Sequence, residues 1–187
     1  MTNETSNVSY VLKLTAVLLA ITIVVAALLG GVNALTAGPI SELNKQKTAN
    51  AIMEVLPSEA EAEEITDFAD ETGLVTTLYK VGEDGYVAKI IVGGSQADIE
   101  MMVGVAADQT VSGISFIAMS ETPGLGAIAA QDSTKGQQFR DQYIGLSGEL
   151  AVTKDGGVVD SLTGATVTSR AVTTGVNAAL ACVAANS

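Results

Sequence analysis

A continuous apolar run near the N-terminus constrains this chain more than any other feature. Residues 14–32 carry no charge, and Thr15 and Thr22 are their only hydroxyl side chains. As a helix the run would measure roughly 28 Å, close to the ~30 Å of hydrocarbon in a bilayer. A cleaved signal peptide is the alternative, because residues 32–34 read Val-Asn-Ala. The run is longer than the roughly 7–15 apolar residues of such a signal, so a retained anchor is favoured.

The anchor divides the chain into a predicted order of parts. We expect a short tail over residues 1–10, a transmembrane helix over 11–35, a connecting helix and acidic linker over 36–72, and a soluble domain over 73–187. In the connector, Pro39 is expected to begin a helix that Pro57 ends. Residues 59–64 hold four glutamates and are interpreted as a solvated linker or helix face.

The charges beside the apolar run do not decide its orientation. Lys13 precedes the run, while Lys45 and Lys47 follow it. The positive-inside rule therefore gives no clear answer.

Charge and metal-binding residue types exclude several functions. The formal net charge is −12, from 9 Lys and Arg against 21 Asp and Glu, which argues against a nucleic-acid partner. The chain has no histidine and one cysteine, Cys182. Intrachain disulfides, cysteine-rich iron–sulfur sites and histidine-based zinc sites are therefore excluded. If the protein moves electrons, an organic cofactor must carry them. Cys182 itself is expected to be a buried small side chain.

Strand patterns dominate after residue 73. Segments 74–81 and 86–92 flank Gly-Glu-Asp-Gly, and segments 99–106 and 110–118 flank Ala-Asp-Gln, so each pair predicts a hairpin. Together they predict an antiparallel sheet of about four strands with packed helices, an α+β fold. Without βαβ alternation or a Gly-x-Gly-x-x-Gly turn, a Rossmann nucleotide site is not expected.

Three further elements complete the predicted domain. Residues 136–143 are expected to form a short helix that places Phe139 and Tyr143 in the core. Residues 150–153 and 158–159 are expected to form a last hairpin that leads to Asp160. The final helix is indicated by apolar residues at helical spacing, namely Val172, Val176, Ala179, Leu180 and Val183.

The start of that final helix is rich in hydroxyl groups. Thr166, Thr168 and Ser169 stand where an N-cap residue belongs. The first N–H groups of a helix lack intrahelical partners and attract phosphate. From residue types alone, a simply capped C-terminal helix is the preferred interpretation.

A short motif before this helix changes that balance. It reads Asp160-x-x-Thr163-Gly164-Ala165-Thr166 and resembles the flavinylation motif Asp-x-x-(Ser/Thr)-Gly-Ala-(Thr/Ser) of FMN-binding domains. In that family the final hydroxyl carries FMN through a phosphoester bond that a flavin transferase of the ApbE type installs. By this resemblance Thr166 is the attachment residue, and residues 73–187 are an FMN-binding domain.

The surroundings of the motif narrow the resemblance. The chain also has one N-terminal apolar span and the sequence Glu121-Thr122-Pro123-Gly124-Leu125-Gly126 upstream. This combination resembles the G subunit of the Rnf electron-transport complex over nearly the whole chain. The C subunit of the sodium-pumping NADH:quinone reductase shares the motif, but its family is typically longer.

The resemblance implies roles for individual residues. Glu121, Thr122 and Leu125 are expected near the flavin. Thr163 is expected to cap the helix or bond to the flavin phosphate, and Gly164 with Ala165 to leave room for the transferase. Asp160 would present the loop or contact the transferase's metal; its structural alternative is an Asx turn. Ser120 stands where related sequences often have histidine.

No catalytic or metal-binding residue is expected in this chain. A threonine hydroxyl is a poor nucleophile without an activating base or metal. The sequence supplies no histidine, and the nearest carboxylates are Asp155 and Asp160. Thr166 is therefore expected to be the substrate of a separate transferase.

The resemblance implies a membrane-anchored electron carrier. It would relay electrons through covalent FMN in a complex that couples ferredoxin and NAD redox chemistry to Na⁺ or H⁺ transport. Its partners would be the other integral and peripheral subunits, and its single-pass anchor would leave the C-terminal domain outside the cytoplasmic membrane. Two alternatives stay open: a flavoprotein subunit of a related reductase or extracellular electron-transfer chain, and a non-redox anchored binding module.

Overall fold

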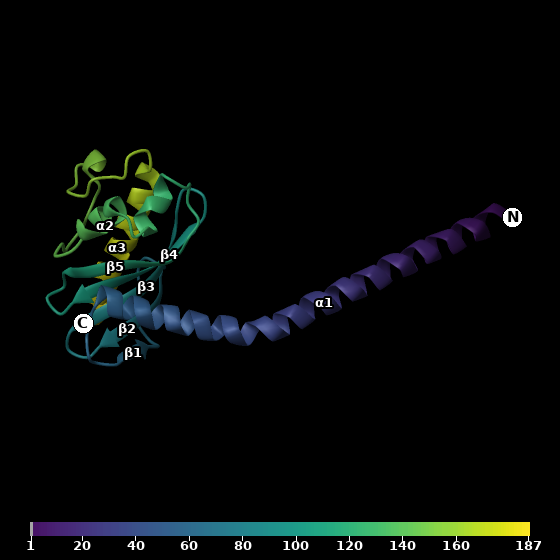
Figure 1. Cartoon of the computed structure of the whole chain (residues 1–187), viewed down its shortest axis with the longest axis horizontal. Coiled ribbons are helices and arrows are strands. Elements are labelled where there is room, and N and C mark those ends of the chain that lie inside the picture. Colours follow the sequence, from purple (N-terminus) through teal and green to yellow (C-terminus); the bar gives the residue numbers. More distant parts are fainter. Residues whose placement is uncertain (1) are drawn as a thin grey trace. The chain divides into compact units, whose positions relative to one another are not determined.

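The computed structural model describes residues 2–187 (Figure 1). It separates into two compact units, one that ends at Gln46 and one that spans Lys47–Ser187. The predicted domain limits at residues 10, 35 and 72 stay predictions.

Helix α1, Thr2–Val55, is one continuous helix. Pro39 lies inside it, so the prediction that a separate helix begins there is wrong. The fixed φ of proline is compatible with a helix, but its missing N–H removes one hydrogen bond and its ring crowds the carbonyl four residues earlier. The stretch Tyr10–Val55 is long and apolar enough to cross a membrane, and an 18-residue window within it has a mean hydropathy of 2.6. Large apolar side chains from Tyr10 to Leu35 are exposed, as a lipid-facing segment requires.

The second unit is built on an antiparallel sheet whose strands follow one another in chain order. Four strands lie where the sequence predicts them, because apolar and polar residues alternate there with the period of a strand. The predicted α+β fold is thus confirmed. The strands are β1 (Ala62–Ile65), β2 (Val75–Val81), β3 (Gly85–Gly93), β4 (Asp98–Ala106) and β5 (Val111–Met119).

Strand β1 corrects the interpretation of the glutamate-rich segment. Ala62–Ile65 pairs with β2 as an edge strand, whereas the sequence predicts a solvated linker or helix face over residues 59–64. Backbone hydrogen bonds make this pairing, and the glutamate side chains stay exposed. An edge strand needs no buried face of its own, so its composition resembles that of a loop.

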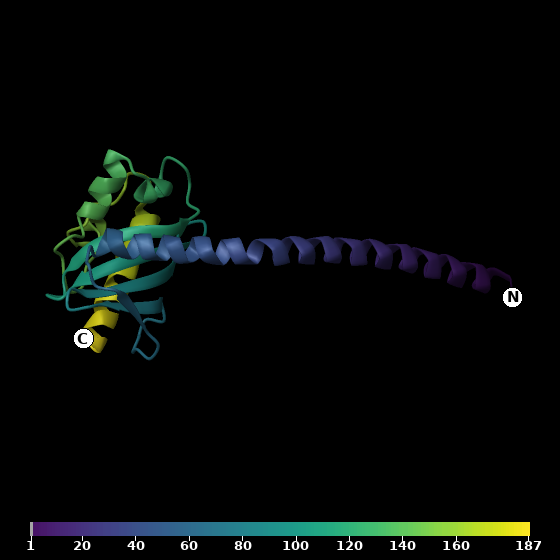
Figure 2. The ribbon, with the colours of Figure 1, turned by 60° about the horizontal axis from the view of Figure 1, so that its bottom comes forward.

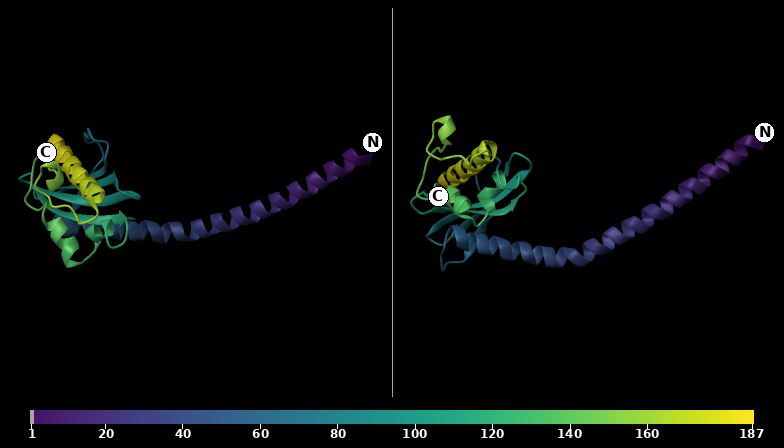
Figure 3. Two further views of the ribbon diagram at one scale, coloured as in Figure 1. Left: turned by 90° about the horizontal axis from the view of Figure 1, so that it is seen from above. Right: turned by 45° about the horizontal axis from the view of Figure 1, so that its top comes forward.

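The sheet has a helix on each face. Helix α3, Thr166–Asn186, packs on one side in a large apolar cluster. Ala51, Ile52, Val55 and Leu56 pack with Val81, Val87 and Met102 in a second cluster. Figures 2 and 3 show the sheet between the blue last turns of α1 and the yellow α3. The predicted apolar face of α3 is buried, as is Cys182, and burial raises the pKa of its thiol to about 11.

Short helices line the end of the domain that holds the motif. They are η1 (Gly126–Ala130), α2 (Thr134–Asp141) and η2 (Thr153–Asp155). Phe139 and Tyr143 are buried with their rings edge to face, which confirms their predicted place in the core. The predicted hairpin is wrong: Val152 and Val159 form an isolated parallel bridge. The turn η2 and the left-handed Gly156 bring the chain round a full loop, so it returns in its original direction.

Candidate functional site

Helix α3 begins at Thr166 with its first turn uncapped. The residue before it, Ala165, offers no capping side chain, and Gly164 holds a left-handed φ of 77°. The backbone N–H groups of residues 166–168 find no acceptor within the described chain. The prediction that Thr166, Thr168 or Ser169 caps the helix is wrong, because the helix starts early enough to include all three. Unsatisfied donors and a positive dipole end are the general features of an anion site.

The three hydroxyl groups of this first turn have different partners. Thr168 is buried, and its hydroxyl donates to Glu121 Oε2 at 2.9 Å. Ser169 is buried, donates to the Ala165 carbonyl at 3.0 Å and accepts from Leu162 N–H at 3.0 Å. Thr166 is half-buried, and its Oγ1 accepts from Lys154 Nζ at 2.8 Å. Of these three hydroxyls, that of Thr166 is the accessible one.

Glu121 ties three segments together. Its side chain is buried, and Oε1 accepts from the backbone N–H groups of Ser95 at 2.7 Å and Gln96 at 3.1 Å. Oε2 accepts from Thr168 on α3. A Cβ placed on Gly126 would lie 2.9 Å from Oε2, so glycine is required where this loop passes. The carboxylate is thus occupied by the protein's own donors.

A cavity of about 270 Å³ opens between these segments and the head of α3. It brings together six of the eight residues predicted to bind the cofactor: Glu121, Thr122, Leu125, Gly164, Ala165 and Thr166. Its remaining lining comes from Ser95, Gly126, Val167 and Thr168.

The other two predicted residues lie elsewhere. Asp160 and Thr163 line a separate cavity of about 550 Å³ together with Lys135, and Leu125 borders both cavities. The hydrogen bonds of Asp160 run from its backbone to the Gln142 side chain, so its carboxylate forms no Asx turn. The hydroxyl of Thr163 makes no hydrogen bond within the described residues, so Thr163 does not cap α3. The residues of the motif thus line two different cavities.

Lys154 is a site residue that sequence reasoning missed. It lies on η2, and the next residue, Asp155, accepts two hydrogen bonds from Arg170, at 2.7 and 2.6 Å. This contact holds the pKa of Asp155 below its ordinary value of 3.8. The sequence places Lys154 only 12 residues before Thr166. No periodicity signals the contact, because it depends on how the 152–159 loop closes.

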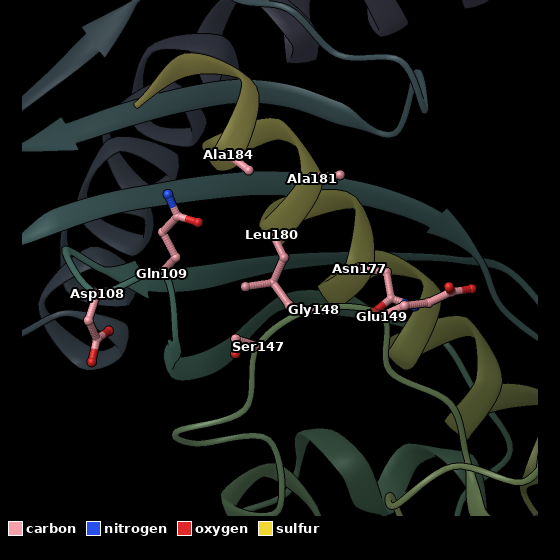
Figure 4. A pocket seen from close by; sticks show the side chains of 9 residues that line it. All are labelled: Asp108, Gln109, Ser147, Gly148, Glu149, Asn177, Leu180, Ala181 and Ala184. Atoms are coloured by element: carbon pink, nitrogen blue, oxygen red, sulfur yellow. The ribbon is translucent and has the colours of Figure 1, made fainter.

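A further cavity of about 450 Å³ lies along the second half of α3 (Figure 4). Asp108, Gln109 and Glu149 are among the residues that line it, and Asn177 points from the helix toward the loop. Asn177 exchanges two hydrogen bonds with the backbone of Leu150, so its amide is already used in joining loop and helix. None of the predicted site residues lies in this cavity.

Comparisons with known proteins match the sequence of this chain to a family. Residues 94–181 match the model of the FMN-binding domain, a range that includes both the 94–97 turn and the head of α3. The G subunit of the Na⁺-translocating ferredoxin:NAD⁺ oxidoreductase complex of Acetobacterium woodii is 33% identical over 89% of this chain and 88% of its own. The G subunit of an ion-translocating oxidoreductase complex of Methanosarcina acetivorans is 31% identical over 96% and 98%.

The chain belongs to the family of G subunits of Rnf-type complexes. Among solved structures, the C subunit of the Na⁺-translocating NADH-quinone reductase of Parabacteroides distasonis matches 54% of this chain and 56% of its own, at 25% identity and a TM-score of 0.43.

The residues at the head of α3 fit the phosphate end of FMN. The first turn has free N–H groups, and the Lys154 ammonium donates to the hydroxyl of Thr166, the first residue of that turn. Backbone N–H groups and a cation are the donors that phosphate oxygens require. Gly164 leaves this approach open, since nothing but Leu125 Cδ2 lies near where its Cβ would be, at 3.0 Å. The donors present at the head of α3 are therefore of the kind that a phosphate group needs.

Proposed function

We propose that this chain carries FMN on Thr166 as a phosphoester and relays electrons within an Rnf-type ion-translocating oxidoreductase. The observation that carries the proposal is the position of the Thr166 hydroxyl. It lines the cavity, is partly exposed and accepts from Lys154, whereas the Thr168 and Ser169 hydroxyls are buried and donate to protein acceptors.

Attachment needs an activated flavin donor. Direct condensation of a phosphate with an alcohol releases water and is unfavourable in aqueous solution. We therefore infer a flavin dinucleotide as donor and a transferase of the ApbE type as catalyst. The Thr166 oxygen then bonds to the flavin phosphorus, the phosphoanhydride bond breaks, and the nucleoside monophosphate leaves. The hydroxyl proton passes to the transferase, because no base on this chain contacts Thr166 within the described residues.

The surroundings of Thr166 suit exchange of electrons with a neighbour. Bound FMN supplies reversible electron transfer. The chain's part is to hold that group at the surface: at about 270 Å³, the cavity is below the ~300–1,000 Å³ of enclosed small-molecule sites. Leu125, 41% exposed, forms an apolar border on which a ring can rest while one edge stays in solvent. Such exposure permits close approach of another redox protein.

We further propose that α1 anchors the protein in the cytoplasmic membrane with residues 47–187 on the extracytoplasmic side, beside the other members of the complex. The apolar exposed stretch from Tyr10 supports the anchor, and family membership supports the assembly. A cysteine introduced at exposed Glu61 should react with an impermeant reagent on intact cells. Reaction only after lysis would reverse the orientation.

Peptide mass spectrometry tests the attachment. Full-length protein is co-expressed with a flavin transferase, and Thr166→Val, which removes the hydroxyl and keeps the shape, should abolish covalent flavin while α3 folds. Thr163→Val, in the other cavity, should retain covalent flavin at Thr166 with weaker modification. Flavin retained in Thr166→Val would move the acceptor to Thr168 or Ser169. A wild-type protein without flavin would favour the binding-module alternative.

A further inference from the structure

Two consecutive loop residues contact two residues of α3 that lie one turn apart. Lys154 Nζ donates to Thr166 Oγ1 at 2.8 Å, and Asp155 accepts from Arg170 Nε and Nη2 at 2.7 and 2.6 Å. Because residues i and i+4 share one face of a helix, both contacts lie on the same side of α3. We call these four residues the clasp.

The two contacts of the clasp differ in charge balance. Arg170 and Asp155 neutralise each other as a bidentate pair. Lys154 has no carboxylate within 4 Å among the residues that the structure describes, and its ammonium donates to a neutral hydroxyl. The cation beside the attachment oxygen therefore has no counter-charge in direct contact, and the neighbouring Asp155, which acts on it at longer range, is already paired with Arg170.

An anion joined to Thr166 would supply that counter-charge. A phosphodiester keeps one negative charge at neutral pH, and an acidic protein repels it unless a cation is near. The free N–H groups of α3 contribute only partial charges. An ammonium at hydrogen-bond distance from the bridging oxygen is the group placed to pair with the non-bridging phosphate oxygens.

Resting on the proposed attachment of FMN at Thr166, we propose that Lys154 is the positioning residue that holds the flavin phosphate, and that Asp155 and Arg170 fix the loop so that Lys154 reaches it. Lys154 orients the hydroxyl before attachment and pairs with the phosphate afterwards. Asp155 and Arg170 touch neither the hydroxyl nor the phosphate and act through the loop.

The test follows covalent flavin over time by intact-protein mass spectrometry, with full-length protein and a flavin transferase. Lys154→Gln should slow attachment about tenfold, since it replaces a charge-assisted hydrogen bond by a neutral one. Lys154→Arg should restore the rate to within about threefold, because the charge returns. Asp155→Asn should slow attachment about twofold to fivefold, in line with an exposed ion pair.

Lys80→Gln is the matched control. It removes the same charge from an exposed lysine on β2 that lines neither of the two cavities, and its rate should equal that of the wild type. Circular dichroism and thermal unfolding confirm that each variant folds.

The outcomes separate this proposal from the proposed function. Slow Lys154→Gln with rescue by Lys154→Arg supports the phosphate-holding role. Wild-type rates in Lys154→Gln would overturn it while leaving attachment at Thr166 intact. Equal loss in Lys154→Gln and Lys154→Arg, with both folded, would also overturn it, because the charge would then not matter. A wild-type protein that never carries flavin would remove both proposals together.

Discussion

The last turn of α1 and the first turn of α3 lie on opposite faces of one sheet. They differ in whether their terminal polar groups have hydrogen-bond partners within the protein. At the end of α1, the Val55 carbonyl accepts from Ser112 Oγ at 2.6 Å. Glu54 accepts from Ser115 Oγ at 2.6 Å. At the start of α3, the N–H groups of residues 166–168 have no acceptor in the described chain. One helix end is closed by its own protein, and the other is left open beside a cavity.

Glycines make the closed end possible. Gly104 and Gly113 face each other on β4 and β5, and a Cβ on either would lie 2.6 or 3.0 Å from the Val55 carbonyl oxygen. The helix end thus packs directly on the strands. At the open end glycine serves access instead, since Gly164 turns the chain into α3 without covering Thr166. The open end is the one where we propose that the flavin phosphate binds, which fits the need of such a group for free N–H donors.

Truncation should give the largest effect on the closed end. A fragment of residues 40–187 keeps the end of α1 and should unfold cooperatively, whereas a fragment of residues 73–187 exposes Val81, Val87 and Met102. Loss of Ile52, Val55 and Leu56, together with the pairing of β1 on β2, should lower the free energy of unfolding by roughly 5 kcal/mol or more. Chemical denaturation measures it. Equal stability would support residue 73 as the start of the domain, and unequal stability would support residue 47.

Adding one methyl group between α1 and the sheet should destabilise the domain less than removing α1 does. Gly104→Ala places Cβ against the Val55 carbonyl and should cost about 3 kcal/mol of unfolding free energy. Gly93→Ala is the control, because its Cβ meets nothing within 4 Å. Both are measured by urea denaturation. Similar losses for the two variants would show that α1 does not press on the sheet.

The buried hydrogen bond of Thr168 should contribute more to stability than an exposed threonine on the same helix. Thr168→Val takes one donor from the buried Glu121 carboxylate and should cost about 2 kcal/mol. Thr174→Val changes an exposed threonine on the same helix and should cost less, about 0.5 kcal/mol or under. Thermal unfolding compares them. No difference would mean that Thr168 does not hold Glu121.

The clasp should give the smallest effect, visible in acid. Its hydrogen bonds from Arg170 lower the folded-state pKa of Asp155, so its contribution is present above pH 3.8 and lost as pH falls through the lowered folded value. The ¹³C shift of the Asp155 carboxyl should therefore titrate below pH 3.8. In Arg170→Gln the midpoint should rise toward 3.8. An unchanged midpoint would show that Arg170 is not the cause.

Sequence periodicity determined the elements of the domain. The uncharged run of residues 14–32 predicts an apolar helix, and the alternation of apolar and polar residues predicts β2 to β5. These patterns are visible in the sequence because the side chains of one buried face recur at short, regular spacing. Strand β1 is not predicted because the side chains of an exposed edge strand show no such pattern. The prediction of a helix start at Pro39 is wrong because α1 continues through this proline despite the lost hydrogen bond and the crowding of its ring against the preceding turn.

For the site, the sequence determined which residues are chemically available, and the tertiary structure decided which of them meet. The motif predicts Thr166, Asp160 and Thr163 as parts of one cofactor site, whereas in the structure Asp160 and Thr163 line a different cavity from Thr166 and Leu125 borders both. Glu121 reaches Thr168 across 47 residues, and Lys154 reaches Thr166 across 12. Such contacts depend on how strands, turns and helices pack together. Packing is a property of the whole chain, so no local pattern records it.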